Sequence, residues 1–514
     1  MFSVEDIMHL INEVEERFPV DKWVIDDIHV WPIMRFNLHF ALLPHTYKSG
    51  APEKVNNREI NYFLSKPLRI FKNFAEFVCA YLMDYKVNNG LNISAGVVLL
   101  SDGFSYSRLK GVWYENFCDP FITYFRKKNI SSLLMTPTYQ YFIPTYSRAM
   151  FILPHLAYIT FIKNVFSKEA NLPQENLSDF EKLNDFLKTH SVNSVSFDLT
   201  KIRKKVRRIR ACADFYKEIF KKIKPRLALM VEYYRTQGMA FSLACREFGI
   251  PCVDIQHGFQ VDSHVAYGRW NKVPESGYEL LPAIFWCWSN YEVSIIEKWS
   301  KNISRWHKPI VGGNLLFKIW QDDNNDFVKY YDRKITEIEE RYPGFLHILF
   351  TLNGDTESEL KTLLSIIEKA QDSRLPYYFW IRLHPCRLNN KRKIKNILSK
   401  HEFLNIEFDK ATDFPLYALL RHMDLHITEF SSTVIEAEAF GVPSIIVHPL
   451  GSGVFKEQIL SGWALPVYDL DQILPAIQTQ QKKRKLLIQT QLNKVASDAK
   501  GTDILLDLIN KKIT

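Results

Sequence analysis

The chain has 514 residues and a formal net charge of +9, from 66 basic and 57 acidic side chains. Hydrophobic residues make up 46% and charged residues 24%, which allows two or three packed domains and argues against extensive disorder. The modest positive excess does not indicate a nucleic-acid partner. The seven cysteines include no C-x-x-C pair, so reduced and mostly buried thiols in a cytoplasmic protein are expected.

The N-terminus, "MFSVEDIMHLINEVEERFP", predicts an amphipathic helix with acidic charges rather than a signal peptide. The most apolar run, residues 149–162, is too short to span a bilayer and contains Pro154 and His155. We expect a buried core segment there, with an interfacial helix as the alternative. The predicted location is therefore cytoplasmic, with peripheral attachment to the inner face of the membrane left open.

Basic residues are concentrated in "KIRKKVRRIR" (201–210) and "KKIKPR" (221–226), on either side of a helix-like segment. Such a run is commonly the solvated face of a long helix. The alternative interpretation is a patch that binds anionic lipid headgroups or a phosphorylated acceptor.

Short apolar runs followed by helix-like periodicity recur along the chain and predict buried parallel strands in doubly wound α/β sheets. The predicted strands are residues 96–101, 131–137, 226–232, 251–256 and 283–289 in the first half, and 347–352, 377–383, 425–428 and 443–448 in the second.

The expected organisation is an N-terminal α/β domain with helical additions (1–310), a C-terminal α/β domain (311–490) and a final helix (491–514) that packs back across both. The boundary follows the glycine pair of "KPIVGGNLL" (308–316), after which the polar stretch 321–327 suits a linker. Ligands are expected at the carboxyl ends of the strands, in a central cleft between two facing Rossmann-like domains.

In "HITEFSSTVIEAEAFGVPSIIVHP" (426–449), a strand is followed by a turn and a helix that ends at Gly441. Ser431, Ser432 and Thr433 fall at the helix start, where free N–H groups and hydroxyls suit a phosphate. An ordinary N-cap is the alternative, although one serine would be enough for it. Glu436, further along the helix, is a candidate for a sugar or ribose hydroxyl.

The run "WIRLHPC" (380–386) places Arg382 and His384 at the end of another strand, and both are candidates for contacting the donor. A structural His-Pro turn is the alternative. The loop "TLNGD" (351–355) adds Asn353 and Gly354, whose amides could meet a phosphate.

The order "R-x-HP … SS" resembles bacterial sialyltransferases, polysialyltransferases and Kdo transferases of the two-Rossmann-domain class called GT-B. It is similar also to glycerophosphotransferases of teichoic acid synthesis. The resemblance covers roughly residues 345–450 and implies that His384, Ser431 and Ser432 hold the phosphate of a CMP-sugar. Gly313, in "VGGN" (311–314), resembles the interdomain glycine turn of this class. The runs 30–35 and 255–259 resemble surface-polysaccharide biosynthesis proteins.

Three candidates for the catalytic base lie in the first half. Asp102, in "VVLLSDGFS", partly matches an acidic-acidic-Gly motif whose carboxylate is the base in the sialyltransferases, although Ser101 replaces the first acid. A turn-forming Asp-Gly is the alternative. His257, in "CVDIQHGF", and Glu232, after "LALMV", also follow predicted strands.

These features together predict a metal-independent glycosyltransferase that needs no cofactor. It would move a sugar from a nucleotide donor, preferably CMP-Kdo or CMP-sialic acid and otherwise a UDP-sugar, to a glycan or lipid-linked glycan of capsule or lipopolysaccharide. A CDP-glycerol-type polyol-phosphate transferase and a catalytically silent scaffold of glycan synthesis are the alternatives. A UDP-sugar epimerase is expected to show a richer set of acids.

Overall fold

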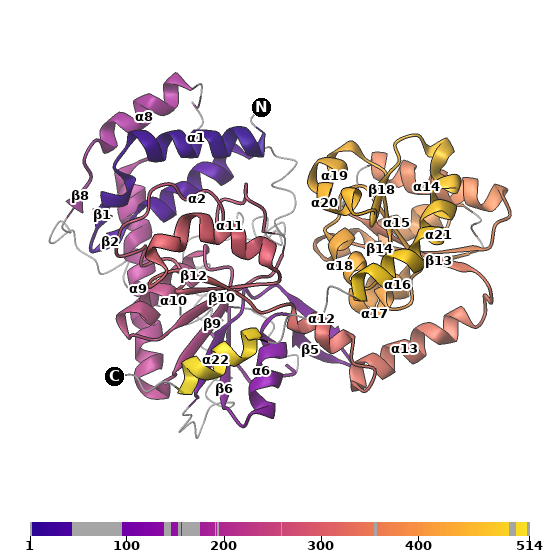
Figure 1. The fold of residues 1–514 in the computed structure, drawn as a ribbon, viewed down its shortest axis with the longest axis horizontal. Helices are drawn as coiled ribbons and strands as arrows, with labels where there is room; N and C mark the ends of the chain where they lie inside the picture. Colours follow the sequence, from indigo (N-terminus) through magenta and orange to yellow (C-terminus); the bar gives the residue numbers. More distant parts are fainter. Residues whose placement is uncertain are drawn as a thin grey trace, which may run out of the picture. The chain divides into compact units, whose positions relative to one another are not determined.

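The computed structural model describes residues 3–43, 95–137, 145–152, 156, 175–190, 192, 195–258, 260–353, 357–401, 403, 405–492 and 500–510. The chain forms two compact units (Figure 1), one of Met1–Leu316 with Asp498–Thr514 and one of Phe317–Ser497. Each unit contains one large parallel sheet with helices on its faces. The predicted class, two Rossmann-like α/β domains with extra helices in the first half, is confirmed.

The first unit contains a seven-stranded parallel sheet in the order β12-β11-β10-β9-β3-β6-β7. All five strands predicted in the first half of the chain are present in it. The strands are β3 (Val97–Leu100), β6 (Ser132–Thr136), β7 (Ala149–Phe151), β9 (Leu227–Val231), β10 (Cys252–Ile255), β11 (Ile284–Cys287) and β12 (Lys308–Val311).

Successive side chains of these strands enter cores on opposite faces of the sheet, as the pleat requires. Val98 and Leu100 pack with the N-terminal helices and with α9 and α10, whereas Val97 and Leu99 pack with α6 and α22. Figure 1 shows α6 and the C-terminal helix α22 side by side on the face opposite α9. The helices are α6 (Cys118–Lys127), α8 (Phe180–Thr189), α9 (Leu199–Ile223), α10 (Thr236–Glu247), α11 (Asn290–Ser300) and α22 (Lys500–Asn510), and α12 (Leu315–Trp320) spans the boundary between the two units.

A fully buried ion pair between Glu15 and Arg35 joins the two N-terminal helices, and Arg35 also ties them to the rest of the first unit. Glu15 lies on α1 (Val4–Arg17) and also accepts a hydrogen bond from the Trp31 indole at 2.8 Å. Arg35 lies on α2 (Trp31–Leu42) and donates to the Gly268 carbonyl at 2.8 Å and to the Val265 carbonyl at 3.1 Å. The motif "VWPIMR" is thus part of the packing of this unit.

Short strands complete the first unit. β1 (Val24–Ile25), β2 (Ile28–His29) and β8 (Glu175–Asn176) form a small sheet, and β4 (Tyr106–Leu109) pairs with β5 (Val112–Glu115) in a hairpin. Of the run 149–162, the described part is β7 with residues 152 and 156, and the rest lies outside the described residues. Among the described helices, none is both long and apolar enough to cross a membrane.

The second unit contains a six-stranded parallel sheet in the order β15-β14-β13-β16-β17-β18. The four strands predicted in the second half are all present. The strands are β13 (Leu346–Leu352), β14 (Tyr377–Leu383), β15 (Ile406–Glu407), β16 (Leu425–Thr428), β17 (Ser444–Ile446) and β18 (Ala464–Pro466).

Helices cover both faces of the second sheet (Figure 1). Arg421 and His422 follow α17 and bind Asp332 of α13, which fixes these two helices to each other. The helices are α13 (Asp326–Glu339), α14 (Glu357–Asp372), α15 (Lys391–Leu398), α16 (Asp409–Asp413), α17 (Leu416–Leu420), α18 (Thr433–Ala439), α19 (Pro449–Val454), α20 (Lys456–Leu460) and α21 (Ile473–Leu492). The segment 491–514 contributes the end of α21 and α22, and α22 packs on the first unit.

Candidate functional site

Each large sheet has one point where the direction of strand addition reverses. In the first unit, β6 and β7 lie on one side of β3 and β9 to β12 lie on the other, so the reversal falls between β3 and β9. In the second unit it falls between β13 and β16. Ligands of open α/β sheets bind outside the carboxyl ends of the strands at such a point. The predicted site residues Asp102, Glu232, Asn353 and Ser431 follow these four strands.

Asp102 organises the turn that follows β3. One carboxylate oxygen accepts hydrogen bonds from the backbone N–H groups of Phe104 (2.8 Å) and Ser105 (2.9 Å), and the other accepts one from the Ser105 hydroxyl (2.5 Å). Gly103 has φ +83°, and a Cβ there would lie 2.9 Å from the Pro137 carbonyl oxygen. The Asp102 side chain therefore has the hydrogen bonds of a turn-forming residue.

Glu232 follows β9 with a backbone conformation that its residue type disfavours. Its φ is +59°, in the left-handed region, where a non-glycine residue stores strain. The turn is held in place by α10, because a Cβ at Gly238 would approach the Glu232 carbonyl oxygen to 2.6 Å. The carboxylate forms an ion pair with Arg235. Strain at a residue fixed in this way is typical of functional positions.

A tyrosine hydroxyl lies between Glu232 and the next candidate, His257. The Tyr234 hydroxyl is 3.2 Å from His257 Nε2 and 3.4 Å from Glu232 Oε1. The His257 and Glu232 side chains retain 15% and 12% exposure, so both reach the surface at the carboxyl edge. Arg235 lies over the ring of Phe104, 5.0 Å from its centroid, and so links this turn to the Asp102 turn.

Two buried polar side chains, Asp254 and His264, lie beneath the turn that carries Glu232 and Tyr234 and near His257. Burial raises the pKa of Asp254 to about 8, and its carboxyl accepts hydrogen bonds from the Tyr233 N–H (3.1 Å) and the Tyr267 hydroxyl (2.9 Å). Burial lowers the pKa of His264 to about 3, assisted by His257 and another nearby imidazole. Both groups are therefore neutral near pH 7 and act as fixed hydrogen-bonding partners.

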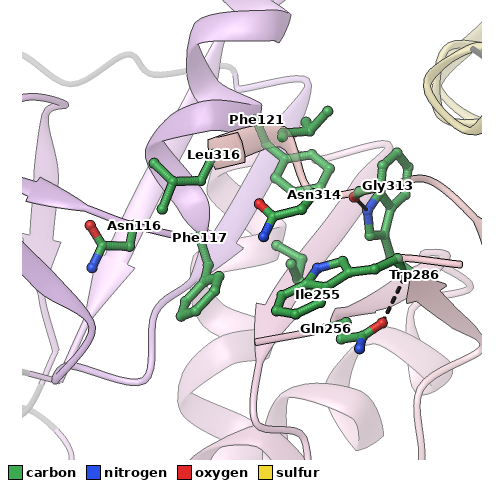
Figure 2. Close-up of a pocket in the computed structure, with 11 residues that line it drawn as sticks. Asn116, Phe117, Phe121, Ile255, Gln256, Trp286, Gly313, Asn314 and Leu316 are labelled. Atoms are coloured by element: carbon green, nitrogen blue, oxygen red, sulfur yellow. Dashed lines mark hydrogen bonds between the residues drawn. The ribbon is translucent and has the colours of Figure 1, made fainter. Parts of the chain in front are cut away.

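A small pocket lies at the carboxyl ends of β10 to β12 (Figure 2). Gln256 is fixed there, because its oxygen accepts from the Trp288 N–H at 2.6 Å and its nitrogen donates to the Gly258 carbonyl at 2.9 Å. The Gly313 carbonyl accepts from the Trp286 indole at 2.8 Å. The predicted glycine turn thus belongs to the first unit, where Gly313 has φ +73°.

In the second unit, Asn353 at the end of β13 binds the turn after β16. The side-chain amide of Asn353 is oriented with its oxygen toward that turn. In this orientation the oxygen accepts hydrogen bonds from the N–H groups of Ser431 (3.0 Å) and Phe430 (3.2 Å). Its own N–H donates to Glu359 Oε1 at 2.7 Å. Asn353 is therefore a bridge across the reversal point. The predicted contact of Gly354 lies outside the described residues.

Most of the N–H groups expected to bind an anion at the start of α18 have partners within the fold. Ser431 Oγ accepts from the Thr433 N–H at 3.3 Å and donates to the Thr433 hydroxyl at 3.0 Å. Ser432 is the N-cap residue, is exposed and makes no capping hydrogen bond. Asn353 accepts from the N–H groups of Phe430 and Ser431, and the Ser431 hydroxyl is bonded to Thr433. Of the two serines, Ser432 is therefore the one available to a ligand. Helix α18 ends as predicted, with Gly441 at φ +69°.

His384 and Arg382, on neighbouring positions of the same edge, have different roles. The His384 N–H continues the strand ladder to the Leu352 carbonyl at 3.1 Å, so His384 lies level with Asn353. Burial lowers the pKa of His384, assisted by the positive charge of Arg382. Arg382 Nη1 donates to the Ala411 (2.7 Å) and Phe414 (2.6 Å) carbonyls. Arg382 therefore stabilises the end of α16 through Nη1, and its contact with the donor stays a prediction.

The Glu436 side chain, on the short helix α18, is partly buried rather than fully exposed to solvent. Burial raises its pKa to about 7, and its Oε2 has no hydrogen-bond partner among the described residues. A partly buried carboxyl with an unpaired oxygen is available to a hydroxyl group of a ligand, which keeps the prediction for Glu436 open.

Tyr234 and Arg235 are absent from the residues predicted from sequence. Both follow β9 directly, so the rule that strand ends carry site residues would have included them. The Tyr-Tyr-Arg run lacks the glycine, histidine or acid that drew attention to the other strand ends.

No family model matches the chain, and no curated protein is significantly similar to it in sequence. Among solved structures, the UDP-GlcNAc 2-epimerase of Neisseria meningitidis bound to UDP-GlcNAc has 16% identity and a TM-score of 0.42, over 77% of this chain and 99% of that chain. A glycosyltransferase of Rickettsia africae has 12% identity and a TM-score of 0.44, over 81% and 100%. The Methanocaldococcus jannaschii UDP-GlcNAc 2-epimerase in complex with UDP-GlcNAc and UDP has 13% identity and a TM-score of 0.41, over 75% and 92%.

Proposed function

We propose that the protein is a metal-independent glycosyltransferase that uses a nucleotide-activated sugar, with a CMP-activated acidic sugar as the preferred donor and a cell-surface glycan as acceptor. One observation supports the proposal most strongly. In both sheets, candidate polar residues follow the two strands between which the strand order reverses, which is where open α/β sheets bind ligands. Transfer needs a stabilised phosphate leaving group and an acceptor for the proton of the attacking hydroxyl.

The second unit would bind the nucleotide. His384 and Ser432 supply donors at one edge, and Asn353 orders the turn that carries Ser432. An imidazole with a lowered pKa is neutral near pH 7 and can donate one N–H to a phosphate oxygen. Glu436, with its unpaired oxygen, would accept from a ribose or sugar hydroxyl.

The first unit would supply the proton acceptor. Asp102 uses both oxygens within its own turn, whereas Glu232 and His257 are partly exposed at the neighbouring strand ends. We therefore assign the base to the Glu232–His257 pair and give Asp102 a supporting role in the loop.

The direct test is incubation of the full-length protein with CMP-Kdo, CMP-sialic acid, CDP-glycerol and UDP-sugars, with nucleotide release as the readout. Release of CMP from a CMP-sugar supports the proposal. Release from CDP-glycerol alone identifies a polyol-phosphate transferase instead. Nucleotide binding without release from any donor identifies a scaffold.

Replacement of either nucleotide contact should weaken binding. We expect Ser432→Ala and His384→Ala each to raise the Kd for CMP roughly 10-fold or more, since a hydrogen bond to a charged group contributes about 1.5–3 kcal/mol. Isothermal titration calorimetry on the full chain measures this Kd. The control is Ser399→Ala, an exposed serine whose hydroxyl donates to the Asn396 carbonyl. Equal affinity in all three variants would contradict the assignment.

We further propose that the basic face of α9 binds an anionic membrane surface. Arg203 and Arg210 are paired with acids, whereas Lys204, Arg207 and Arg208 are exposed and have no acidic partner among the described residues. The like-charged pair Lys204 and Arg208 at i,i+4 destabilises a helix by a few tenths of a kcal/mol. Because this like-charged pair lowers the stability of the helix, its presence is consistent with a role of the basic face in binding an anionic surface.

The combined reversals Lys204→Glu, Arg207→Glu and Arg208→Glu should lower partition onto phosphatidylcholine vesicles containing phosphatidylglycerol by at least about 100-fold, given about 1 kcal/mol per basic residue. Sedimentation with vesicles measures the bound fraction. The matched control reverses Lys318, Lys329 and Arg333, which are exposed in the second unit. Equal binding to pure phosphatidylcholine vesicles, or an equal loss in the control, would remove the proposal. Binding of soluble polyphosphate but not of vesicles would indicate a phosphorylated acceptor.

A further inference from the structure

We infer that the small pocket at the carboxyl ends of β10 to β12 binds an uncharged, N-acetylated sugar of the acceptor, with the methyl of its acetamido group among aromatic rings. This inference rests on the proposed function and deepens it, because it names the class of acceptor sugar. All the residues that line the pocket belong to the first unit.

Aromatic rings make up much of the pocket (Figure 2). Phe117 and Trp288 are partly exposed there, whereas Phe121 and Trp286 are buried. Among the described residues that line the pocket, none has a charged side chain. A phosphate, carboxylate or ammonium group would therefore lose water here without gaining a counter-charge. The lining favours an uncharged ligand with an apolar part.

Two polar groups of the pocket are available to such a ligand. The side-chain amide of Asn116 and the indole N–H of Trp288 have no hydrogen-bond partner among the residues that the structure describes. An amide both donates and accepts hydrogen bonds, and an indole donates one. Gln256 differs from them, because its nitrogen already donates to the Gly258 carbonyl at 2.9 Å and to Glu292 Oε1 at 3.2 Å.

The walls of the pocket are fixed in position. The Trp286 indole donates to the Gly313 carbonyl at 2.8 Å and meets the edge of the Phe121 ring, 5.0 Å between centroids. A Cβ at Gly312 would lie 1.9 Å from the Trp286 ring, so the indole rests directly on the backbone of that turn. A pocket that is already formed needs little ordering when a ligand binds, which favours affinity.

The pocket adjoins two of the strand-end turns of the first unit. The Asn116 N–H donates to the Ser105 carbonyl at 2.9 Å, and Ser105 belongs to the turn organised by Asp102. The Phe117 ring meets the His257 imidazole edge-on, 6.1 Å between centroids. A sugar held in the pocket would therefore lie beside the strand ends that carry the candidate catalytic groups.

An acetamido group matches this lining better than a bare hydroxyl does. The pocket is small, so we place one substituent in it rather than a whole sugar ring. The methyl gains from contact with the aromatic rings, whereas a hydroxyl in the same place would lose water without that gain. The acetamido oxygen can accept from Asn116 or from the Trp288 indole, and its N–H can donate to the Asn116 oxygen.

The first test is an NMR titration of the full-length protein, without donor, using methyl N-acetyl-β-glucosaminide and methyl β-glucoside, and the corresponding pair of galactosides. We expect an N-acetylated glycoside to bind about 10-fold more tightly than its plain partner, since a buried methyl contributes about 4-fold and a hydrogen bond about 5-fold. Saturation transfer from the protein should be strongest at the acetamido methyl. Equal affinity within both pairs would overturn the inference.

The second test places the sugar in the pocket. Asn116→Ala and Trp288→Leu should each raise the Kd of the N-acetylated glycoside about 5-fold or more and leave the Kd for CMP unchanged. The matched controls are Asn302→Ala, at an exposed position, and Trp306→Leu, at a partly exposed one, both outside the pocket. If Trp288→Leu fails to fold, Asn116→Ala decides, because it removes a side chain without partners among the described residues. Wild-type affinity in Asn116→Ala would overturn the inference.

Failure of this inference can be told apart from failure of the proposed function. Selective binding of the N-acetylated glycoside that is lost in Asn116→Ala, with no donor turned over, would leave the pocket assigned and remove the transferase. Nucleotide release from a donor, with no preference for N-acetylated glycosides, would keep the transferase and remove the assignment of the pocket.

Discussion

Glu232→Gly should produce a protein that is at least as stable as the wild type and yet almost inactive. Glycine adopts φ +59° without the steric cost that glutamate bears there, so about 1 kcal/mol of strain is relieved. The lost ion pair with Arg235 offsets little of this gain, because the Arg235 side chain is 41% exposed. The carboxylate that orients the base is removed, so nucleotide release should fall at least about 100-fold.

Glu232→Ala separates the two effects. Alanine also lacks the carboxylate but keeps the disfavoured backbone conformation, so this variant should be inactive and should unfold at a lower temperature than Glu232→Gly. Thermal unfolding by circular dichroism and the nucleotide-release assay measure both quantities. If Glu232→Gly keeps wild-type activity, Glu232 has no part in the reaction. If it unfolds below Glu232→Ala, the turn is not strained.

Arg35→Met should destabilise the first unit by about 3–5 kcal/mol, because it leaves the Glu15 carboxylate buried without its counter-charge. The guanidinium also satisfies the Val265 and Gly268 carbonyls and lies over the Trp270 ring, 4.4 Å from its centroid. All of these contacts join the N-terminal helices to the loop beyond β10. Urea titration followed by tryptophan fluorescence measures the loss.

Two further variants define the origin of that loss. Arg207→Met, at an exposed position without an acidic partner among the described residues, should change stability by less than about 0.5 kcal/mol. The double variant Glu15→Gln with Arg35→Met should be less destabilised than Arg35→Met alone, because no bare charge remains. A double variant as unstable as the sum of its parts would show that the ion pair is not the source.

The strands and the fold class could be predicted from sequence because fully buried parallel strands have a strong local signal. Runs such as residues 227–231 are apolar over their whole length, and helices follow the predicted strands in regular alternation. The hairpin β4–β5 was missed, since Tyr106–Leu109 mixes polar and apolar residues without a long buried run. The order of strands, and with it the two reversal points, depends on contacts distant in sequence.

The candidate site was predicted less completely than the fold. The rule that polar residues at strand ends form sites identified Glu232, His257, His384 and Ser432, whose roles remain predictions. For Arg382, the strand position alone does not show that Nη1 turns to carbonyls of a neighbouring helix, and its contact with a donor remains a prediction. The amides before α18 were expected to be free, but Asn353 lies next to them only through the pairing of β13 with β16.

The packing of α22 on the first unit has a consequence for biosynthesis. Leu505 and Ile509 of α22 belong to the same core as strands β3 and β9, and a Cβ on Gly501 would approach Gly312 Cα to 2.5 Å. A nascent chain leaving the ribosome can thus form the second sheet before the first has received its last apolar side chains. The core of the first unit is therefore incomplete until residues 500–510 have been synthesised. Chaperone dependence during synthesis should therefore be greatest for the half that is made first.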